Sequence, residues 1–495
     1  RVAATEASAD GLNWTFAPMV DISRDARWGR VMEGAGEDPY LGSLVAKARV
    51  HGFQGDNLND INTIVACAKH FAGYGFSEAG RDYNTTDFNQ YTLHNTIMPP
   101  FKAAVDAGVR TFMNSFNTLD EIPATGHKHI QRDILKGDWE FDGFIVSDWG
   151  SIDQMIPHGF ARDGNHAAEL AVNAGSDMDM ESSLYVSQLV GLVESGKVDV
   201  EKINDATRRI LRVKYELGLF DDPYKYCNKE RSDLELASDE NMAVSLDAAK
   251  KSIVLLKNNN QLLPIEKDGK KIAIIGPLAN DKNSPLGNWR SQAVYNSASS
   301  VVEGMNKYKG NRIVYEKGVD LYYGKTNFHN RVKINYDDRS DFNKAKFAAA
   351  TSDIVIMVLG EEGNQSGEGR SRTNIGLPGL QLELLKEIRK INNNIVLVVM
   401  SGRPLDLSWE DENIPAIVQA WHLGSKSGDA IAQVLYGDYN PSGKLTMSFP
   451  RNVGQVPIYY NFKNTGRPST SIQQVTNSGY ADVENSPLYS FGYGL

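Results

Sequence analysis

Short apolar runs and stretches of helical spacing alternate along the first 220 residues of the chain. Each apolar run ends in polar residues, a pattern that predicts a buried strand with functional groups at its end. We expect strands at 14–22, 63–71, 110–116, 143–148 and 176–180. We expect helices between them at 41–53, 90–106, 131–135 and 169–174. Alternation of this kind predicts βα units that build a parallel sheet.

Polar side chains gather just past the ends of these strands, where a (β/α)8 barrel places its chemistry. They are Asp21, Lys69, His70, Asn117, Asp148 and Trp149. The pattern predicts about five strands, whereas eight strands close such a barrel. We therefore expect a TIM-like barrel whose N-terminal part is missing from this chain, or is supplied by a neighbouring subunit.

A polar, proline-containing stretch separates this region from a second one. Residues 198–219 have helical spacing, and residues 221–250 are expected to be a linker, with a helix from about 241. Apolar runs beyond the linker predict strands at 252–257, 271–276, 354–360, 395–401 and 416–421, and a helix at 380–391. The expected domains are a barrel-like domain at 1–220, an α/β domain at 251–450 and a C-terminal tail at 451–495.

Composition and charge exclude several classes of function. The formal charge is −10, from 52 Lys and Arg against 62 Asp and Glu, and no basic block argues for a nucleic-acid partner. Apolar runs such as 395–400 are far shorter than the ~20 residues of a membrane helix, so membrane insertion is not expected. Two cysteines, Cys67 and Cys227, cannot build a disulfide framework. Cys67 is interpreted as a small core residue.

The segment GFIVSDWGS at 143–151 delivers a carboxylate and an indole to the end of a strand. Asp148 could attack or stabilise an oxocarbenium-like carbon, and Trp149 could cover the apolar face of a sugar. The alternative is that Asp148 only caps the helix that follows. The pattern alone leaves both interpretations open.

A glycine-rich loop at 359–379 carries three carboxylates, Glu361, Glu362 and Glu368. It has neither of the glycine-rich phosphate fingerprints, and its acidic residues would repel a phosphate. A loop that presents a general acid fits this composition, and an ordinary exposed acidic loop is the alternative.

Histidines give little further chemistry. Lys69 and His70, at a strand end, could donate hydrogen bonds to sugar hydroxyls. The alternative is a structural pair whose hydrogen bonds are satisfied within the protein. The pair His127 and His129 is a weak metal signal, and no metal site is expected.

Seven segments in order resemble glycoside hydrolase family three, the β-glucosidase family. They are APMVDISRDARWGRVMEGAGEDPYL, KHFAGYG, GFIVSDWGS, GLFDDPY, SGEGRSRTNI, NPSGKLTMSFP and SFGYGL. The resemblance covers essentially the whole chain and is strongest to bacterial periplasmic β-glucosidases. It implies a (β/α)8 barrel followed by an α/β sandwich domain.

The resemblance also implies the site residues. The nucleophile would be Asp148, and the acid/base would be Glu368, which lies six residues before Asn374 in the family's loop motif. Contacts to sugar hydroxyls would come from Arg30, Lys69, His70 and Arg81, with Trp149 lining the glucosyl site and Trp289 on the aglycone side. The two carboxylates would lie about 5–5.5 Å apart, as retention of configuration requires.

Three departures from the family pattern are visible. The first barrel segment, which supplies an Asp to the far sugar hydroxyls, is absent, and so is the common C-terminal β-sandwich. Phe116 stands where a Tyr is usual, so one hydroxyl near the nucleophile is missing. Tyr74 replaces the His of the family's β-N-acetylglucosaminidases, which disfavours that activity.

The expected function is therefore that of a retaining, exo-acting β-glucosidase that removes terminal β-D-glucosyl residues. The expected substrates are β-glucosides, cello-oligosaccharides or related glycans, and the chemistry needs no cofactor. A periplasmic or secreted location follows from the resemblance, and a homodimer is compatible with it. The alternatives are a β-xylosidase or arabinosidase of the same family and a catalytically idle carbohydrate-binding relative.

Overall fold

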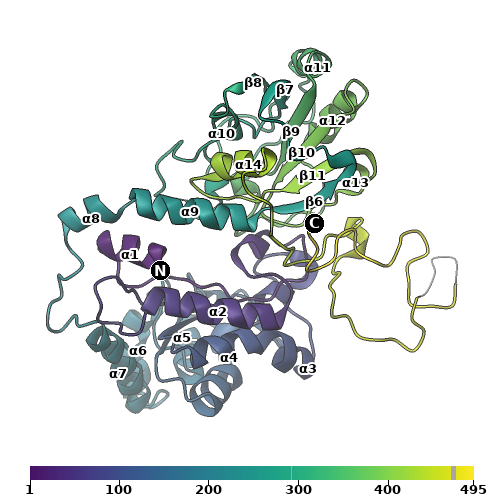
Figure 1. Ribbon diagram of the computed structural model, residues 1–495. Helices are drawn as coiled ribbons and strands as arrows, with labels where there is room; N and C mark the ends of the chain where they lie inside the picture. The colour runs from purple at the N-terminus through teal and green to yellow at the C-terminus, as the bar shows by residue number, and fades with distance from the viewer. Residues whose placement is uncertain (291, 470–474) are drawn as a thin grey trace. The chain divides into compact units, whose positions relative to one another are not determined.

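Two units make up the computed structural model, which describes residues 1–290, 292–469 and 475–495 (Figure 1). Unit 1 comprises residues 1–23 and 33–241, and unit 2 comprises residues 24–32 and 242–495. The short segment 24–32 therefore belongs by its contacts to unit 2, although its neighbours in sequence belong to unit 1.

A parallel sheet forms the centre of unit 1. Its strands are β1 (Cys67–Phe71), β2 (Thr111–Asn114) and β5 (Phe144–Val146), paired in the order β1-β2-β5. Parallel bridges extend it on both sides, from Trp14 to Val65 and Met19 to Lys69, and from Val146 to Met178. The expected strands at 14–22 and 176–180 are thus present as bridged segments. Pro18, which has no N–H to donate, interrupts the first of them.

Helices and one hairpin complete unit 1. The helices are α1 (Val2–Ala9), α2 (Pro39–Gln54), α3 (Gln90–Thr92), α4 (Met98–Asp106), α5 (Gly164–Ala174), α6 (Leu184–Glu194), α7 (Val200–Glu216) and α8 (Lys229–Glu235), and β3 (Thr118–Leu119) pairs with β4 (Ile122–Pro123). The helix expected at 90–106 is interrupted by π-helical Leu93–Ile97. Pro99 and Pro100 explain the break, because neither can donate to the preceding turn.

A six-stranded sheet organises unit 2. Its strands are β6 (Val254–Asn258), β7 (Asp268–Ile275), β8 (Gly310–Glu316), β9 (Ile354–Gly360), β10 (Ile395–Met400) and β11 (Ala416–Gln419). They pair in the order β6-β11-β10-β9-β7-β8, and only β6 runs antiparallel to its neighbour. The sequence pattern missed β8, an edge strand in which polar and apolar residues are mixed.

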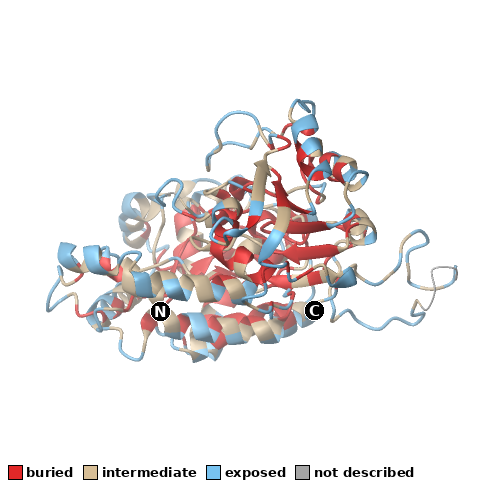
Figure 2. Ribbon diagram, turned by 45° about the horizontal axis from the view of Figure 1, so that its top comes forward, coloured by how far each residue is buried: buried red, intermediate tan, exposed pale blue. Residues whose placement is uncertain are grey.

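Alternate residues of these strands enter two separate cores, one on each face of the sheet. In β10, for example, Leu397 packs with α11 (Phe342–Ala350) and α12 (Gln381–Arg389). Val398 packs on the other face, with α9 (Asp239–Ser252), α10 (Val301–Met305) and α14 (Ser427–Leu435). Burial on both faces explains why the central strands are uninterrupted apolar runs, coloured red in Figure 2. The remaining helix is α13 (Ser408–Asn413).

The stretch at 221–250, expected to be a linker, holds α8 and most of α9. Cys67 is buried in the core of unit 1, as predicted, and burial raises the pKa of its thiol to about 12.

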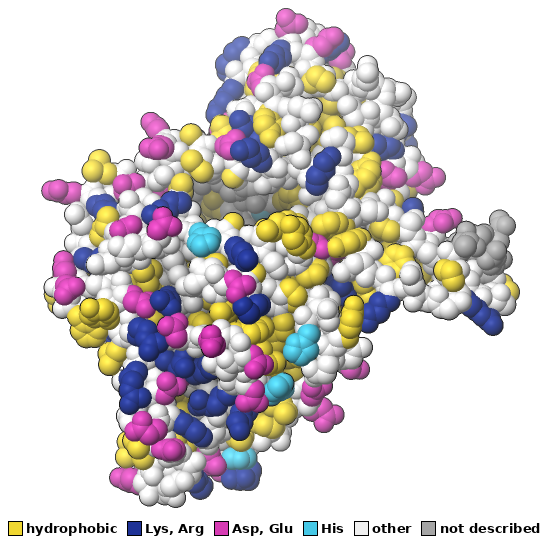
Figure 3. Space-filling view, turned by 60° about the horizontal axis from the view of Figure 1, so that its bottom comes forward, with side chains coloured by type: hydrophobic (Ala, Val, Ile, Leu, Met, Phe, Trp, Pro, Cys, Tyr) yellow, Lys and Arg dark blue, Asp and Glu magenta, His cyan; other side chains and the backbone are white. Residues whose placement is uncertain are grey.

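Charged side chains of both signs are interspersed on the face of the molecule that Figure 3 presents. Within the part of the chain that the structure describes, none of the helices combines the length and the apolar character needed to cross a membrane.

Candidate active site

Asp148 directly follows β5 in unit 1, at the position expected for the nucleophile. The N–H of Ser147 donates to Met178 O (2.9 Å), which anchors the chain just after the strand. The Oδ1 atom of Asp148 accepts the N–H of Trp149 at 2.7 Å, and only 8% of the residue is exposed. Since its partner is the next residue, this bond is not the helix cap of the alternative interpretation.

His70, at the end of β1, faces the same carboxylate. Its Nε2 atom lies 3.7 Å from Oδ2 of Asp148, and the imidazole ring is fully buried. Lys69, the preceding residue of β1, is half-buried, and its backbone pairs with Pro18 and Val20. The structure thus brings the His70 ring and the Asp148 carboxylate together.

Two other expected sugar contacts in unit 1 are exposed. The side chain of Trp149 is accessible, with 62% of the residue exposed, so an apolar ring face is available for stacking. Arg81 lies in the exposed loop after Glu78–Gly80, and among the described residues it forms no ion pair with Asp148.

Glu368 and Arg30 meet within unit 2. The Nη1 atom of Arg30 lies 3.5 Å from Oε1 of Glu368, with side-chain exposures of 2% and 17%. The indole of Trp289, which is half exposed, lies under the same guanidinium, with Cζ of Arg30 5.8 Å from the ring centroid. Phe328 extends this aromatic surface, its ring centroid 5.1 Å from that of Trp289. Phe328 was not predicted from the sequence as a site residue.

Two glycines allow Arg30 and Glu368 to meet. Gly29 directly precedes Arg30, and Gly367 directly precedes Glu368. The N–H of Gly367 donates to Gly29 O at 2.6 Å. A Cβ on Gly29 would lie 2.1 Å from Gly367 O, so any side chain there would push the two segments apart. Gly367 itself has φ +105°, and a Cβ would lie 2.2 Å from Cγ of the buried Asn288.

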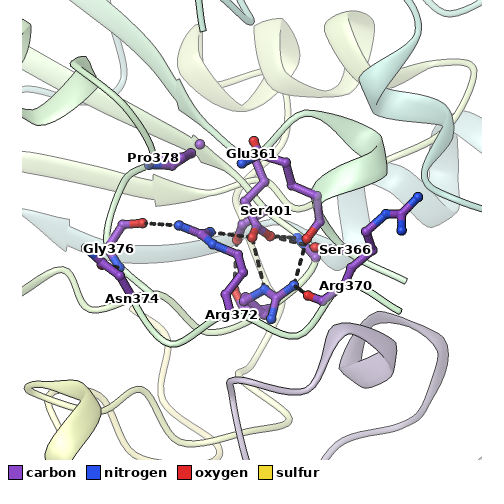
Figure 4. Close-up of polar contacts among 12 residues, drawn as sticks. Glu361, Ser366, Arg370, Arg372, Asn374, Gly376, Pro378 and Ser401 are labelled. Atoms are coloured by element: carbon purple, nitrogen blue, oxygen red, sulfur yellow. Dashed lines mark hydrogen bonds and ion pairs between the residues drawn. The ribbon is translucent and has the colours of Figure 1, made fainter. Parts of the chain in front are cut away.

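Glu361 is held in a buried network at the start of the acidic loop (Figure 4). Its carboxylate accepts hydrogen bonds from Arg372 Nη1 (2.6 Å), Ser366 Oγ (2.6 Å) and Arg403 Nε (2.9 Å). Burial alone would raise the pKa of this carboxyl, but the charges of Arg403 and Arg372 and the hydrogen bonds outweigh it and hold the pKa at about 2. A carboxyl in this state is ionised near neutral pH and cannot donate a proton to a leaving group.

Arg403 ties this network to the segments that carry Arg30 and Glu368. One of its terminal nitrogens donates to the carbonyls of Ala26 (3.3 Å) and Arg27 (2.8 Å), and the other to those of Gln365 and Arg370 (both 2.8 Å). The role of Arg403 could not be predicted from the sequence, because these partners are distant in sequence.

The side chain of Glu362 is also held by contacts within the protein. It pairs with Arg290 (2.8 Å), accepts from the hydroxyl of Thr326 (3.0 Å) and accepts the N–H of Asn364 (2.7 Å). Of the loop's three carboxylates, Glu368 has the most exposed side chain. This arrangement favours Glu368 over its two neighbours as the residue that contacts a substrate.

Metal ligation finds no support around the weak histidine signal. Burial lowers the pKa of the His127 ring, and His129 instead bonds Asp133. Across the described ranges, no group of three His, Cys, Asp or Glu side chains is placed to hold a metal ion.

Replacing Glu361 with Gln removes the ionised carboxyl from the buried network. The stabilisation by a carboxyl with a lowered pKa is complete above its ordinary value of 4.5 and is lost as the pH falls toward about 2. A pKa shift of this size contributes on the order of 3 kcal/mol to the free energy of unfolding. We expect E361Q to unfold at lower urea concentration than wild type near neutral pH, and the gap to narrow below pH 4.5.

Urea unfolding followed by tryptophan fluorescence over a pH series measures this difference. The control is Glu387→Gln, which removes a carboxyl from exposed pairs with Lys390 and Lys346 and should change little at any pH. A gap between wild type and E361Q of the same size at acid and neutral pH would contradict the expectation.

Comparisons with known proteins identify the family of the chain. The model of the glycosyl hydrolase family 3 N-terminal domain matches residues 1–213, and that of the C-terminal domain matches residues 253–495. A periplasmic β-glucosidase of Salmonella typhimurium is 43% identical over 508 residues, which is 100% of this chain and 66% of that protein. A β-xylosidase of Formosa agariphila is 36% identical over 99% of this chain and 68% of that protein.

Among solved structures, the β-glucosidase of Listeria innocua in complex with isofagomine superposes with a TM-score of 0.94. It is 38% identical, and the match covers 100% of this chain and 67% of that one. The chain thus spans about two thirds of the length of these relatives. The family and the fold class expected from the motifs are confirmed, and the chain belongs to glycosyl hydrolase family 3.

Proposed function

We propose that this chain carries the catalytic residues of a retaining β-glucosidase that releases terminal β-D-glucosyl residues. The observation that carries the proposal is the contrast among the carboxylates. The side chains of Glu361 and Glu362 are 0% and 2% exposed and are held by Arg403 and Arg290. Those of Asp148 and Glu368 are 11% and 17% exposed and lie beside expected sugar-binding groups. Relatives named β-glucosidases, matched along the whole chain, support the same activity.

In the proposed first step, a carboxylate oxygen of Asp148 forms a bond to the anomeric carbon while the bond to the leaving oxygen breaks. Glu368 gives its proton to that oxygen, so the aglycone leaves as a neutral alcohol. In the second step Glu368 takes a proton from water, and the water oxygen displaces Asp148 from the sugar. Two displacements give net retention of configuration.

The remaining expected residues are proposed to bind the sugar and its aglycone. Trp149 offers an exposed ring for the apolar face of the glucosyl unit, and His70 lies beside the nucleophile. Lys69 and Arg81 are proposed to donate to hydroxyls, as the family motifs imply. On the acid side, Arg30 stands between Glu368 and the Trp289 ring, which we assign to the aglycone.

A β-xylosidase is the second candidate, because the Formosa relative bearing that name matches 99% of this chain. An aryl β-xyloside hydrolysed more efficiently than the matching β-glucoside would favour it.

A complex of the Listeria enzyme with laminaribiose supports glucose-containing oligosaccharides as substrates of the present chain. The Salmonella relative supports a periplasmic location, and a homodimer stays a prediction.

Glu368→Ala should separate the two chemical steps. Without the acid, substrates with poor leaving groups should slow by several orders of magnitude, whereas dinitrophenyl glucosides, whose leaving group needs no proton, should still form the intermediate. Azide should then replace water in the second step and yield β-glucosyl azide, detectable by mass spectrometry. If Glu361→Ala showed this pattern and Glu368→Ala did not, the acid/base assignment would be wrong.

Gly367→Ala tests the placement of Glu368 by the preceding residue. The added methyl would collide with Asn288, whereas at Gly369, which also has a positive φ of +68°, a Cβ would meet nothing within 4 Å. Both variants strain the loop, but only Gly367→Ala should displace Glu368. We expect it to lower kcat/KM for an aryl β-glucoside at least ~10-fold more than Gly369→Ala. Equal losses in the two variants would argue against this placement.

A further inference from the structure

Asp21 is a buried carboxylate of unit 1 to which neither the proposed mechanism nor the family resemblance gives a role. Its residue is 2% exposed, and it follows the bridge from Met19 to Lys69 that places segment 14–22 beside β1. Withdrawing a carboxylate from water is costly unless hydrogen bonds and opposite charge compensate. The groups that contact the Asp21 carboxylate therefore indicate its role.

Two contacts of Asp21 Oδ2 are to His70. That oxygen accepts the backbone N–H of His70 at 2.9 Å, and it lies 2.9 Å from Nδ1 of the ring. A carboxylate oxygen facing a ring nitrogen requires the proton to be on that nitrogen, so Nδ1 is the donor. Two bonds from one residue also fix the plane of the imidazole and leave Nε2 directed at Oδ2 of Asp148, 3.7 Å away.

The line Asp21–His70–Asp148 places a carboxylate at each nitrogen of one buried imidazole. An imidazole in the low dielectric of a buried site is stabilised in its charged form by carboxylates on both sides. In its charged form the ring stabilises the ionised form of Asp148, which is the form that attacks and the form that is released when the glycosyl bond is hydrolysed. Tyr74, whose ring meets the imidazole edge-on at 5.2 Å, limits the other rotations of the ring.

We propose that Asp21 is a positioning residue for catalysis, acting through His70 to orient and charge the imidazole that faces the nucleophile. The proposal rests on the assignment of Asp148 as the nucleophile. A structural role alone is the competing explanation, in which Asp21 only satisfies the backbone N–H of His70. The two differ in what they require, because a backbone N–H needs an oxygen acceptor, whereas the proposed role needs a negative charge.

Asp21→Asn makes this distinction, because it keeps the shape and one acceptor oxygen but removes the charge. We expect kcat for an aryl β-glucoside to fall roughly 100-fold, with KM changed less than about threefold. Asp21→Glu keeps the charge at the cost of an extra methylene and should retain more activity than Asp21→Asn. A merely structural role predicts the reverse order, because Asn is the better fit.

A double-mutant cycle with His70→Ala tests whether the effect passes through the imidazole. In the His70→Ala background, Asp21→Asn should lower kcat by less than about threefold, since the group through which it acts is gone. If the two losses multiply, Asp21 acts independently of His70 and the proposal is overturned.

Asp177→Asn is the matched control for burying an altered carboxylate in the same unit. Asp177 is also buried, accepts the N–H of Ile145 at 2.9 Å and pairs with Lys136, but it has no bond to His70. We expect it to lower the melting temperature and leave kcat within about threefold of wild type. Failure of Asp21→Asn to fold while Asp177→Asn folds would assign Asp21 to the fold and overturn the proposal.

The same series separates failure of this proposal from failure of the proposed function. A wild-type protein that hydrolyses the aryl glucoside, with Asp21→Asn equally active, overturns only the role of Asp21. Absence of glycosidase activity in the folded wild type overturns both.

Discussion

A buried ion pair between Glu361 and Arg403 holds together the part of unit 2 that carries Arg30 and Glu368. Such a pair is worth its desolvation cost only if its remaining hydrogen-bonding groups are satisfied. Here the guanidinium, which has five N–H donors, donates to Glu361 and to four backbone carbonyls. Those carbonyls belong to segment 24–32 and to the loop around Glu368, so this one cation joins the two segments. Arg30 and Glu368 are therefore held by contacts within unit 2, and Asp148 and His70 by contacts within unit 1.

The central strands of unit 2 could be predicted from the sequence almost to the residue. Residues 354–360 and 395–401 were expected to be strands, and β9 and β10 occupy Ile354–Gly360 and Ile395–Met400. Both are buried on two faces, so each is an uninterrupted apolar run with clear ends. The positions of Asp148 and His70 at strand ends were predictable for a related reason, because parallel strands place their carboxyl ends on one edge of a sheet.

Other features depend on contacts that produce no recognisable pattern in the neighbouring sequence. Segment 24–32 follows a barrel segment in the sequence, and contacts with residues distant in sequence assign it to unit 2. They include the carbonyl contacts of Arg403, the ion pair of Arg30 with Glu368 and the close approach of Gly29 to Gly367. The roles of Glu361 and Asp21 were not visible in the sequence for the same reason, since Arg403 lies 42 residues from Glu361 and His70 lies 49 residues from Asp21. The edge strand β8 was missed because its mixed pattern does not resemble a buried strand.

The central claim is that Asp148 forms a covalent bond to a glucosyl unit, and trapping that bond tests it most directly. The enzyme should react with 2-deoxy-2-fluoro-β-D-glucosyl fluoride to form a glycosyl-enzyme. Because this glycosyl-enzyme is hydrolysed more slowly than it forms, the intermediate accumulates. Mass spectrometry of proteolytic fragments should find one fluoroglucosyl group, on the peptide that contains Asp148, and none on the Asp148→Asn variant. A label on another carboxylate, or faster labelling by the corresponding xylosyl reagent, would contradict the assignment of the nucleophile or of the sugar.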